Sequence, residues 1–194
     1  MNNRNIMDMT SGPFLKKILK FAIPLMITGM LQLVYNAADV MVVGRFAGSD
    51  SLAAVGSTSS LVNLIINLFI GLSTGAGVLT ARYIGAQQPA KTSRCVHTAM
   101  ALSVVSGFLV GIFGFSFSST FLKLMGTPEE ILPLASLYLK IYFLGAPGSL
   151  VYNFGASVVR ATGDTKRPLF ILSFSGIINV ILNLILVIVF HLDV

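Results

Sequence analysis

The stretch "QLVYNAADVMVVGRFAG", residues 32–48, places a carboxylate inside an apolar segment. Asp39 follows Ala38 and precedes Val40, and the run around it has the composition of a membrane-spanning helix. A charged side chain at the centre of a bilayer costs about 2.5 kcal/mol or more, so it is rarely kept without a use. Asp39 is therefore the first candidate functional residue.

The composition of the whole chain favours a membrane protein. Hydrophobic residues make up 55% and charged residues 10%, whereas soluble domains carry about 25% charged residues. The net charge of +6 comes from short basic clusters between apolar runs, so we expect no nucleic-acid partner. The chain has one cysteine, Cys95, and no clustered ligands or nucleophile–base pair, so we expect neither an enzyme nor a cofactor or metal centre.

Five apolar runs are long enough to cross a bilayer, which takes about 20 residues per helix. We predict an all-α membrane protein, with residues 1–17 as a cytoplasmic segment and residues 18–194 as the transmembrane region. Because the number of spans is odd and the last lies close to residue 194, we expect a truncation before a sixth span. The spans are expected at about residues 18–43, 52–81, 95–121, 131–159 and 169–190.

Basic residues predict the orientation, because cytoplasmic loops carry an excess of lysine and arginine. The opposite side has only Arg45 and Lys123, and Lys140 lies inside the fourth predicted span. We expect a multi-pass protein of the plasma membrane with a cytoplasmic N-terminus. The basic residues on the predicted cytoplasmic side are Arg4, Lys16, Lys17, Lys20, Arg82, Lys91, Arg94, Arg160, Lys166 and Arg167.

Polar residues form a stripe along the first span. Gln32, Tyr35, Asn36 and Asp39 are spaced i, i+3, i+4 and i+7, so they share one helix face. Such a face points to a bundle interior or a wet cavity and away from lipid. Further polar residues in the other spans could line the same cavity: Asn63, Asn67, Asn153, Ser175, Asn179 and Asn183.

Structural interpretations of these residues remain open. Asparagine and serine often join membrane helices, at about 0.6 kcal/mol per hydrogen bond. Asp39 could form an ion pair with Lys140, because charges within membranes commonly pair. Pro24 removes one backbone hydrogen bond from the first span, which predicts a kink there.

Three further features receive structural interpretations. The GxxxG spacings at Gly71–Gly75 and Gly107–Gly111 predict close helix packing. Asp164 in "RATGDTKRP" is expected to be a turn residue.

Three segments resemble the multidrug and toxic compound extrusion (MATE) transporters. They are "FAIPLMITGMLQLVYNAADVMVVGRFAGSDSLAAVG", "ARYIGAQQPAKTSR" and "RATGDTKRP". The resemblance extends over about residues 12–193. It implies twelve spans in two six-helix lobes, so this chain would be most of the N-terminal lobe. Its partner would be the missing C-terminal lobe.

The resemblance also implies a site. Family members exchange organic cations for protons or sodium ions, which places the essential acid, and a bound sodium ion where sodium is used, at Asp39. Asn183 stands where many members carry a second acid. In this respect the chain is similar to the DinF-like branch, in which the first-span acid is the main coupling residue. The kink falls at Pro24, and the implied cavity contacts are Gln32, Tyr35, Asn153 and Asn179.

Together these features predict a cation-coupled multidrug efflux antiporter that works by alternating access. Burial of a carboxylate disfavours its charged form, so a proton and an organic cation would compete for Asp39. One alternative is a lipid-linked sugar flippase of the same superfamily, although anionic substrates would call for several basic residues within the membrane. The other is a membrane fragment with a structural or interaction role and no transport.

Overall fold

The computed structural model describes residues 14–46 and 48–189, and every regular element in this part of the chain is helical. The predicted all-α fold is confirmed. In chain order the elements are α1 (Phe14–Phe46), α2 (Ser49–Gly85), α3 (Pro89–Leu124), α4 (Leu132–Leu144), α5 (Ala146–Ala161), α6 (Lys166–Leu184) and the π-helical turn η2 (Ile185–Val189).

The first three helices are longer than a bilayer requires. They contain 33, 37 and 36 residues, or about 50–55 Å each at 1.5 Å per residue. The hydrocarbon core is about 30 Å thick, so their ends extend beyond it. Four helices are long and apolar enough to span a membrane, and there are five spans if α4 and α5 together form one.

The fourth predicted span is not straight. The run expected at 131–159 is divided at Gly145 into α4 and α5, which are bent by 46° relative to each other. Pro147 explains the break, because it lacks the N–H that would continue the helix and its ring crowds the carbonyl of Phe143. The sequence interpretation considered only Pro24 as a source of a kink and overlooked Pro147.

Pro24 lies inside α1, which runs through it without interruption. The Pro24 carbonyl accepts a hydrogen bond of 2.7 Å from the hydroxyl of Thr28, one turn further along. A side-chain donor of this kind satisfies a carbonyl near the point where proline removes a backbone bond. The kink at Pro24 stays a prediction.

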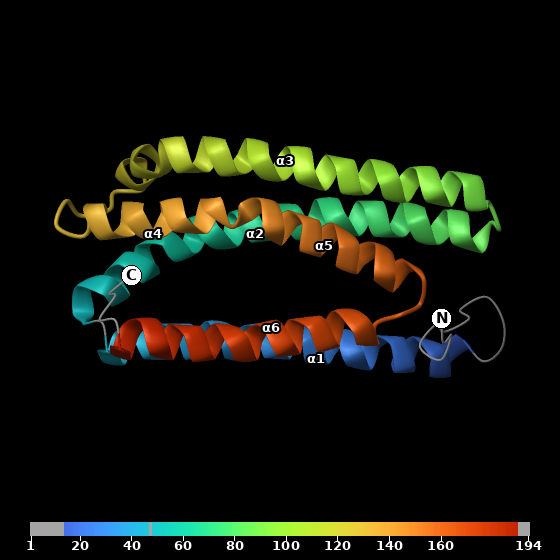
Figure 1. Ribbon diagram of the computed structural model, residues 1–194, viewed down its shortest axis with the longest axis horizontal. Coiled ribbons are helices and arrows are strands. Elements are labelled where there is room, and N and C mark those ends of the chain that lie inside the picture. The colour runs from blue at the N-terminus through green and yellow to red at the C-terminus, as the bar shows by residue number, and fades with distance from the viewer. Residues whose placement is uncertain (1–13, 47, 190–194) are drawn as a thin grey trace.

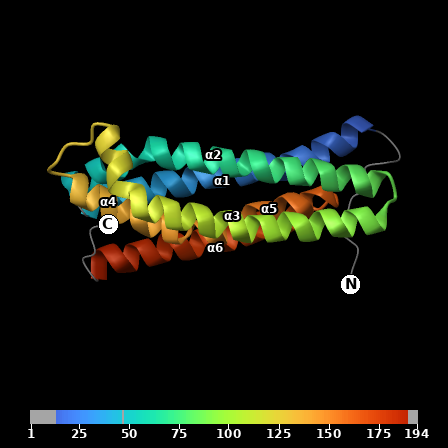
Figure 2. The same ribbon diagram turned by 90° about the horizontal axis from the view of Figure 1, so that it is seen from above.

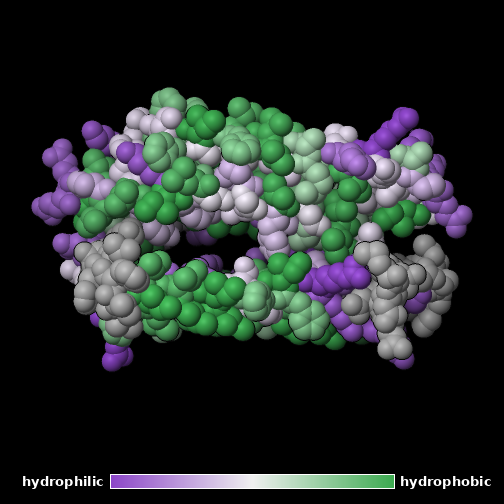
Figure 3. All heavy atoms as spheres, in the orientation of Figure 1, coloured by the Kyte–Doolittle hydropathy of each residue, from purple (hydrophilic) through white to green (hydrophobic). Residues whose placement is uncertain are grey.

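The helices form two layers (Figure 1). Helices α2, α3, α4 and α5 pack on one another as a bundle, whereas α1 packs mainly against α6. Figure 2 shows that the long helices all lie roughly along one common axis. In the space-filling view of Figure 3 an opening separates the α1–α6 pair from the bundle, and the outer surfaces are largely hydrophobic.

Small residues bring the helices of the bundle together. Gly107 and Gly111 of α3 face Pro147 and the Phe143 carbonyl closely enough that a Cβ would crowd them. This confirms the expected role of this GxxxG spacing. Two apolar clusters fill the bundle: one contains Ala54, Leu122, Ala135, Leu139 and Phe143, and the other Phe69, Ala99, Leu150 and Phe154.

Within residues 14–46 and 48–189 the second GxxxG spacing, at Gly71 and Gly75 of α2, does not show the expected packing. No described atom lies within 4 Å of the position that a Cβ would take on either glycine. The spacing alone does not say which face of a helix meets a neighbour, so a glycine pair can equally face lipid.

These two glycine pairs lead to a prediction about stability. A Cβ at Gly107 would lie 2.7 Å from the Cα of Pro147. This Cα is a backbone atom, so no change of side-chain rotamer can relieve the clash. We expect Gly107→Ala to lower the free energy of unfolding by about 1–3 kcal/mol, as overpacking does. Thermal unfolding of the detergent-solubilised protein measures it. Gly71→Ala is the matched control and should be neutral or slightly stabilising; equal losses in the two variants would contradict the packing described here.

Candidate functional site

Asp39 lies at the contact between α1 and α6. Its Oδ1 accepts a hydrogen bond of 2.6 Å from Nδ2 of Asn183, which is 144 positions further along the chain. Both side chains are partly buried. The carboxylate therefore has one strong neutral donor, supplied by a different span.

Tyr35 fixes the same two helices one turn earlier. Its hydroxyl donates to the backbone carbonyl of Ser173 at 3.2 Å. Its ring packs against Gly176 so closely that a Cβ there would overlap the ring. Gly176 is therefore the small residue that lets a tyrosine fit between α1 and α6, and this contact sets the register in which Asp39 meets Asn183.

The structure gathers some of the predicted site residues and leaves others apart. Gln32 and Asn36 lie on α1 and Asn179 on α6, and all three side chains are exposed. Asn153 lies on α5, where its Nδ2 donates to the Ser149 carbonyl of the same helix at 2.8 Å. Among the described residues, the direct polar contact to Asp39 comes from Asn183.

The alternative of an Asp39–Lys140 ion pair is wrong. The Lys140 Nζ lies 5.7 Å from the centre of the Phe115 ring of α3, in the geometry of a cation–π contact. Within residues 14–46 and 48–189 the recorded ion pair joins Arg167 to Asp164, at the other end of the bundle. Asp39 is therefore paired with a neutral amide and not with a base.

Tyr138 of α4 is a residue that sequence reasoning missed. It lies within electrostatic range of Asp39, and no hydrogen bond between the two side chains is recorded within residues 14–46 and 48–189. No polar stripe marks the fourth apolar run, so the only signal was the presence of a tyrosine two residues before Lys140.

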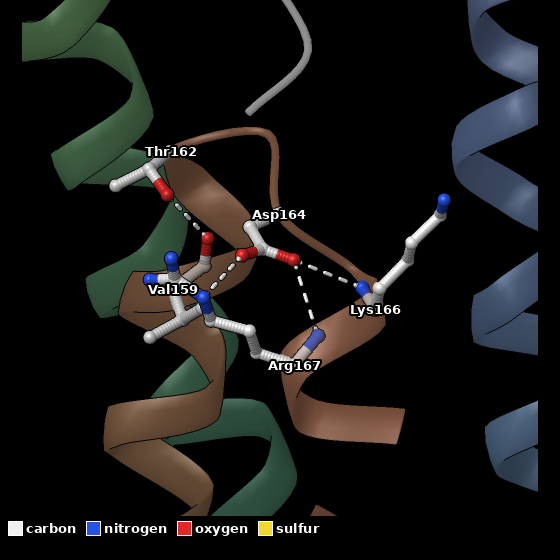
Figure 4. Close-up of polar contacts among 5 residues, drawn as sticks. All are labelled: Val159, Thr162, Asp164, Lys166 and Arg167. Atoms are coloured by element: carbon white, nitrogen blue, oxygen red, sulfur yellow. Dashed lines mark hydrogen bonds and ion pairs between the residues drawn. The ribbon is translucent and has the colours of Figure 1, made fainter. Parts of the chain in front are cut away.

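A second polar cluster lies in the turn that starts α6 (Figure 4). Asp164 is 1% exposed, and its Oδ1 accepts bonds of 3.1 Å from the backbone N–H groups of Lys166 and Arg167. Its Oδ2 lies 3.1 Å from Nε of Arg167. The turn needs Gly163, whose φ is +87°. Asp164 is thus the turn residue that the sequence indicated, and it fixes the start of the helix that carries Asn183.

Comparison with known sequences places the chain in a family. Residues 24–185 match the model of a protein family described as MatE. The probable multidrug resistance protein YoeA of Bacillus subtilis is 32% identical over 167 residues, which cover 86% of this chain and 36% of that protein. The FAD transporter of Shewanella oneidensis is 28% identical over 177 residues, covering 91% of this chain and 39% of that protein.

Solved structures agree with the sequence comparison. An outward-facing multidrug resistance MATE family transporter of the MOP superfamily matches with a TM-score of 0.86 and 29% identity. The match covers 92% of this chain and 39% of that one. The chain thus spans less than half the length of the relatives that it matches.

The Asp39–Asn183 bond leads to a second prediction. Asn183→Leu keeps the branching of the side chain at Cγ but removes the donor, so the carboxylate loses its neutral partner. We expect the free energy of unfolding to fall by about 1 kcal/mol, within the range of hydrogen bonds between membrane helices. Denaturant unfolding in detergent measures it. Asn179→Leu, one turn earlier and exposed, should cost little; if it costs as much, the bond does not hold α1 to α6.

Proposed function

The chain belongs to the MatE family of transporters, and we propose that it works in a cation-coupled multidrug exporter in which Asp39 binds and releases the coupling ion. Its five spans match most of the N-terminal lobe of that fold. The observation that carries the proposal is the half-buried carboxylate of Asp39, held by the amide of Asn183 with no basic partner among the described residues.

A carboxylate in this setting can exchange cations. The amide of Asn183 donates one hydrogen bond but contributes no charge, so Asp39 keeps its negative charge. Asn183 engages Oδ1, which leaves Oδ2 for a proton or a sodium ion. An organic cation would compete for the same charge, and that competition is the simplest basis of antiport.

Binding at Asp39 would also alter the contact between α1 and α6. A hydrogen bond to a charged carboxylate is about twice as strong as one to its neutral form. Protonation therefore weakens the contact with Asn183. We propose that this loosening lets α1 shift relative to α6 and the bundle, which gives the two states that alternating access requires.

Organic cations are the substrate class that the charge of the site favours. Asp39 lies well inside α1, whereas Asp50 lies in the first turn of α2, and Lys140 is engaged with the Phe115 ring. A lipid-linked sugar or a dinucleotide such as FAD carries phosphates, which would call for several basic residues near the cavity. One relative is a FAD transporter, so an anionic substrate is included below as an outcome of the test.

The longer transporter is proposed to lie in the plasma membrane with the first residues of α1 on the cytoplasmic side. The excess of lysine and arginine at one end of the bundle supports this orientation. That end carries the α2–α3 turn and the α5–α6 turn together with the start of α1 (Figure 1).

The coupling role of Asp39 is testable in the whole transporter that contains this chain. Asp39→Asn keeps the shape and the hydrogen bond to position 183 but removes ionisation. We expect normal insertion and thermal stability, and loss of ethidium efflux driven by a pH or sodium gradient in proteoliposomes. Lys140→Met is the control and should keep most of the efflux.

Two outcomes would contradict the proposal. One is efflux by Asp39→Asn at the rate of the unmodified protein. The other is a protein that moves FAD but not the cationic dye and is indifferent to the change at Asp39; that result would favour an anionic substrate.

The proposed orientation predicts which positions react with an impermeant thiol reagent. With Cys95→Ser as background, cysteines at positions 91 and 166 should stay unlabelled in intact cells, because both lie at the cytoplasmic end. A cysteine at position 50, in the first turn of α2 at the opposite end, should be labelled. Labelling of 91 or 166 before the cells are opened would reverse the orientation.

A further inference from the structure

A groove lies between α2 and α3, away from the Asp39 site. Its volume is about 460 Å³, and Phe154 of α5 also lines it. None of the lining residues belongs to α1 or α6. The groove is therefore separate from the site at which we propose cation exchange.

The groove is apolar along most of its length and basic at one end. Leu72 and Leu79 of α2 and Leu102 of α3 line it and are 50%, 41% and 53% exposed. Lys91 and Arg94 line it in the first two turns of α3. A ligand that fills the groove must therefore combine an apolar chain with a negatively charged head.

The dimensions fit one leaflet of a bilayer. From Tyr83 at the basic end to Leu72 is eleven residues of helix, or about 16 Å, and from Lys91 to Leu102 on the antiparallel helix is the same. Half of the hydrocarbon core is about 15 Å thick. The groove is thus about as long as one leaflet is thick, and it runs from the basic end of the two helices into the apolar part of the bundle.

The charge at the mouth is positive without a nearby acid in the sequence. No aspartate or glutamate occurs between Asp50 and Glu129. The Lys91 Nζ lies 6.0 Å from the centre of the Tyr83 ring, so this lysine reaches from α3 across to α2. Arg94 follows one turn deeper, where its guanidinium can bind two oxygens of a phosphate.

We propose that this groove binds an anionic phospholipid from the leaflet at the end of the bundle that carries the α2–α3 turn. The phosphate lies between Lys91 and Arg94, and one acyl chain follows Leu79 and Leu72 toward Leu102. Basic pockets between helices at the membrane interface are the usual sites for such head groups. The site would join α2 to α3 at the turn that links them.

The test is a competition between two lipids for the full chain. Phosphatidylglycerol and phosphatidylcholine with identical acyl chains are mixed in equal amounts with the detergent-solubilised protein, and bound lipid is counted by native mass spectrometry. We expect clear preference for phosphatidylglycerol. Lys91→Gln with Arg94→Gln should weaken its binding on the order of thirtyfold, since each basic residue contributes about a factor of five.

The matched control is Lys20→Gln with Lys166→Gln. It removes the same charge at the same end of the bundle, but from α1 and α6, which do not line the groove. Phosphatidylglycerol binding should change less than about twofold, because charges beyond a Debye length of about 8–10 Å are screened. An equal loss in the control would show general charge attraction and overturn the site, as would equal binding of the two lipids to the unmodified chain.

The groove contains a cysteine whose reactivity can report whether a lipid occupies the groove. Cys95 lines it and is the only cysteine in the sequence. In vesicles, phosphatidylglycerol should slow the reaction of Cys95 with a membrane-permeant maleimide relative to phosphatidylcholine, and Leu102→Trp, which fills the groove, should abolish that difference. If the rate in the whole transporter is slow in both lipids, another part of the protein covers the groove and the proposal is wrong.

Discussion

A carboxylate in a hydrocarbon environment needs a hydrogen-bond donor close by, and this requirement decides which helix stands beside α1. Asn183 supplies that donor from α6, and Tyr35 completes the contact over Gly176. The pairing of the first span with the last described one follows, although almost the whole chain separates them. The other four helices then form a unit of their own, which the α1–α6 pair faces across an opening.

The two layers are held by different kinds of interaction. The bundle of α2 to α5 depends on glycines, on close backbone approach and on two apolar clusters. Such packing is dense and changes little without a large cost. The α1–α6 contact instead rests on a few polar bonds, and the strength of one of them depends on the charge of Asp39. The part of the molecule in which we propose that an ion binds is thus the part with the less extensive packing.

Much of this arrangement could be predicted from the sequence, because membrane spans and polar stripes are local patterns. The spacing from Gln32 to Asp39 marked a polar face of the first span, on which Tyr35 and Asp39 contact α6, and Asp164 was identified as a turn residue. The side chain that partners Asp39 was harder to predict from the sequence. The sequence suggested Lys140 as a partner for Asp39, whereas the structure places this lysine over the Phe115 ring of α3 and pairs Asp39 with Asn183. The position of Tyr138 and the open surroundings of Gly71 depend on which helix faces meet, which a single sequence does not record. The break at Gly145 has a local cause in Pro147, and it was overlooked.

The break at Gly145 ties two distant positions together. In an unbroken helix the Phe143 carbonyl would receive the N–H of residue 147, but that residue is proline and has none. Gly111 of α3 lies so near this oxygen that a Cβ would stand 3.0 Å from it, so only the Cα–H of glycine can approach it, as a weak donor. Gly111 of α3 and Pro147 of α5 therefore belong to one structural feature. Exchange of either residue changes what the other position tolerates, and a designer who straightens α4 into α5 has to redesign α3 as well.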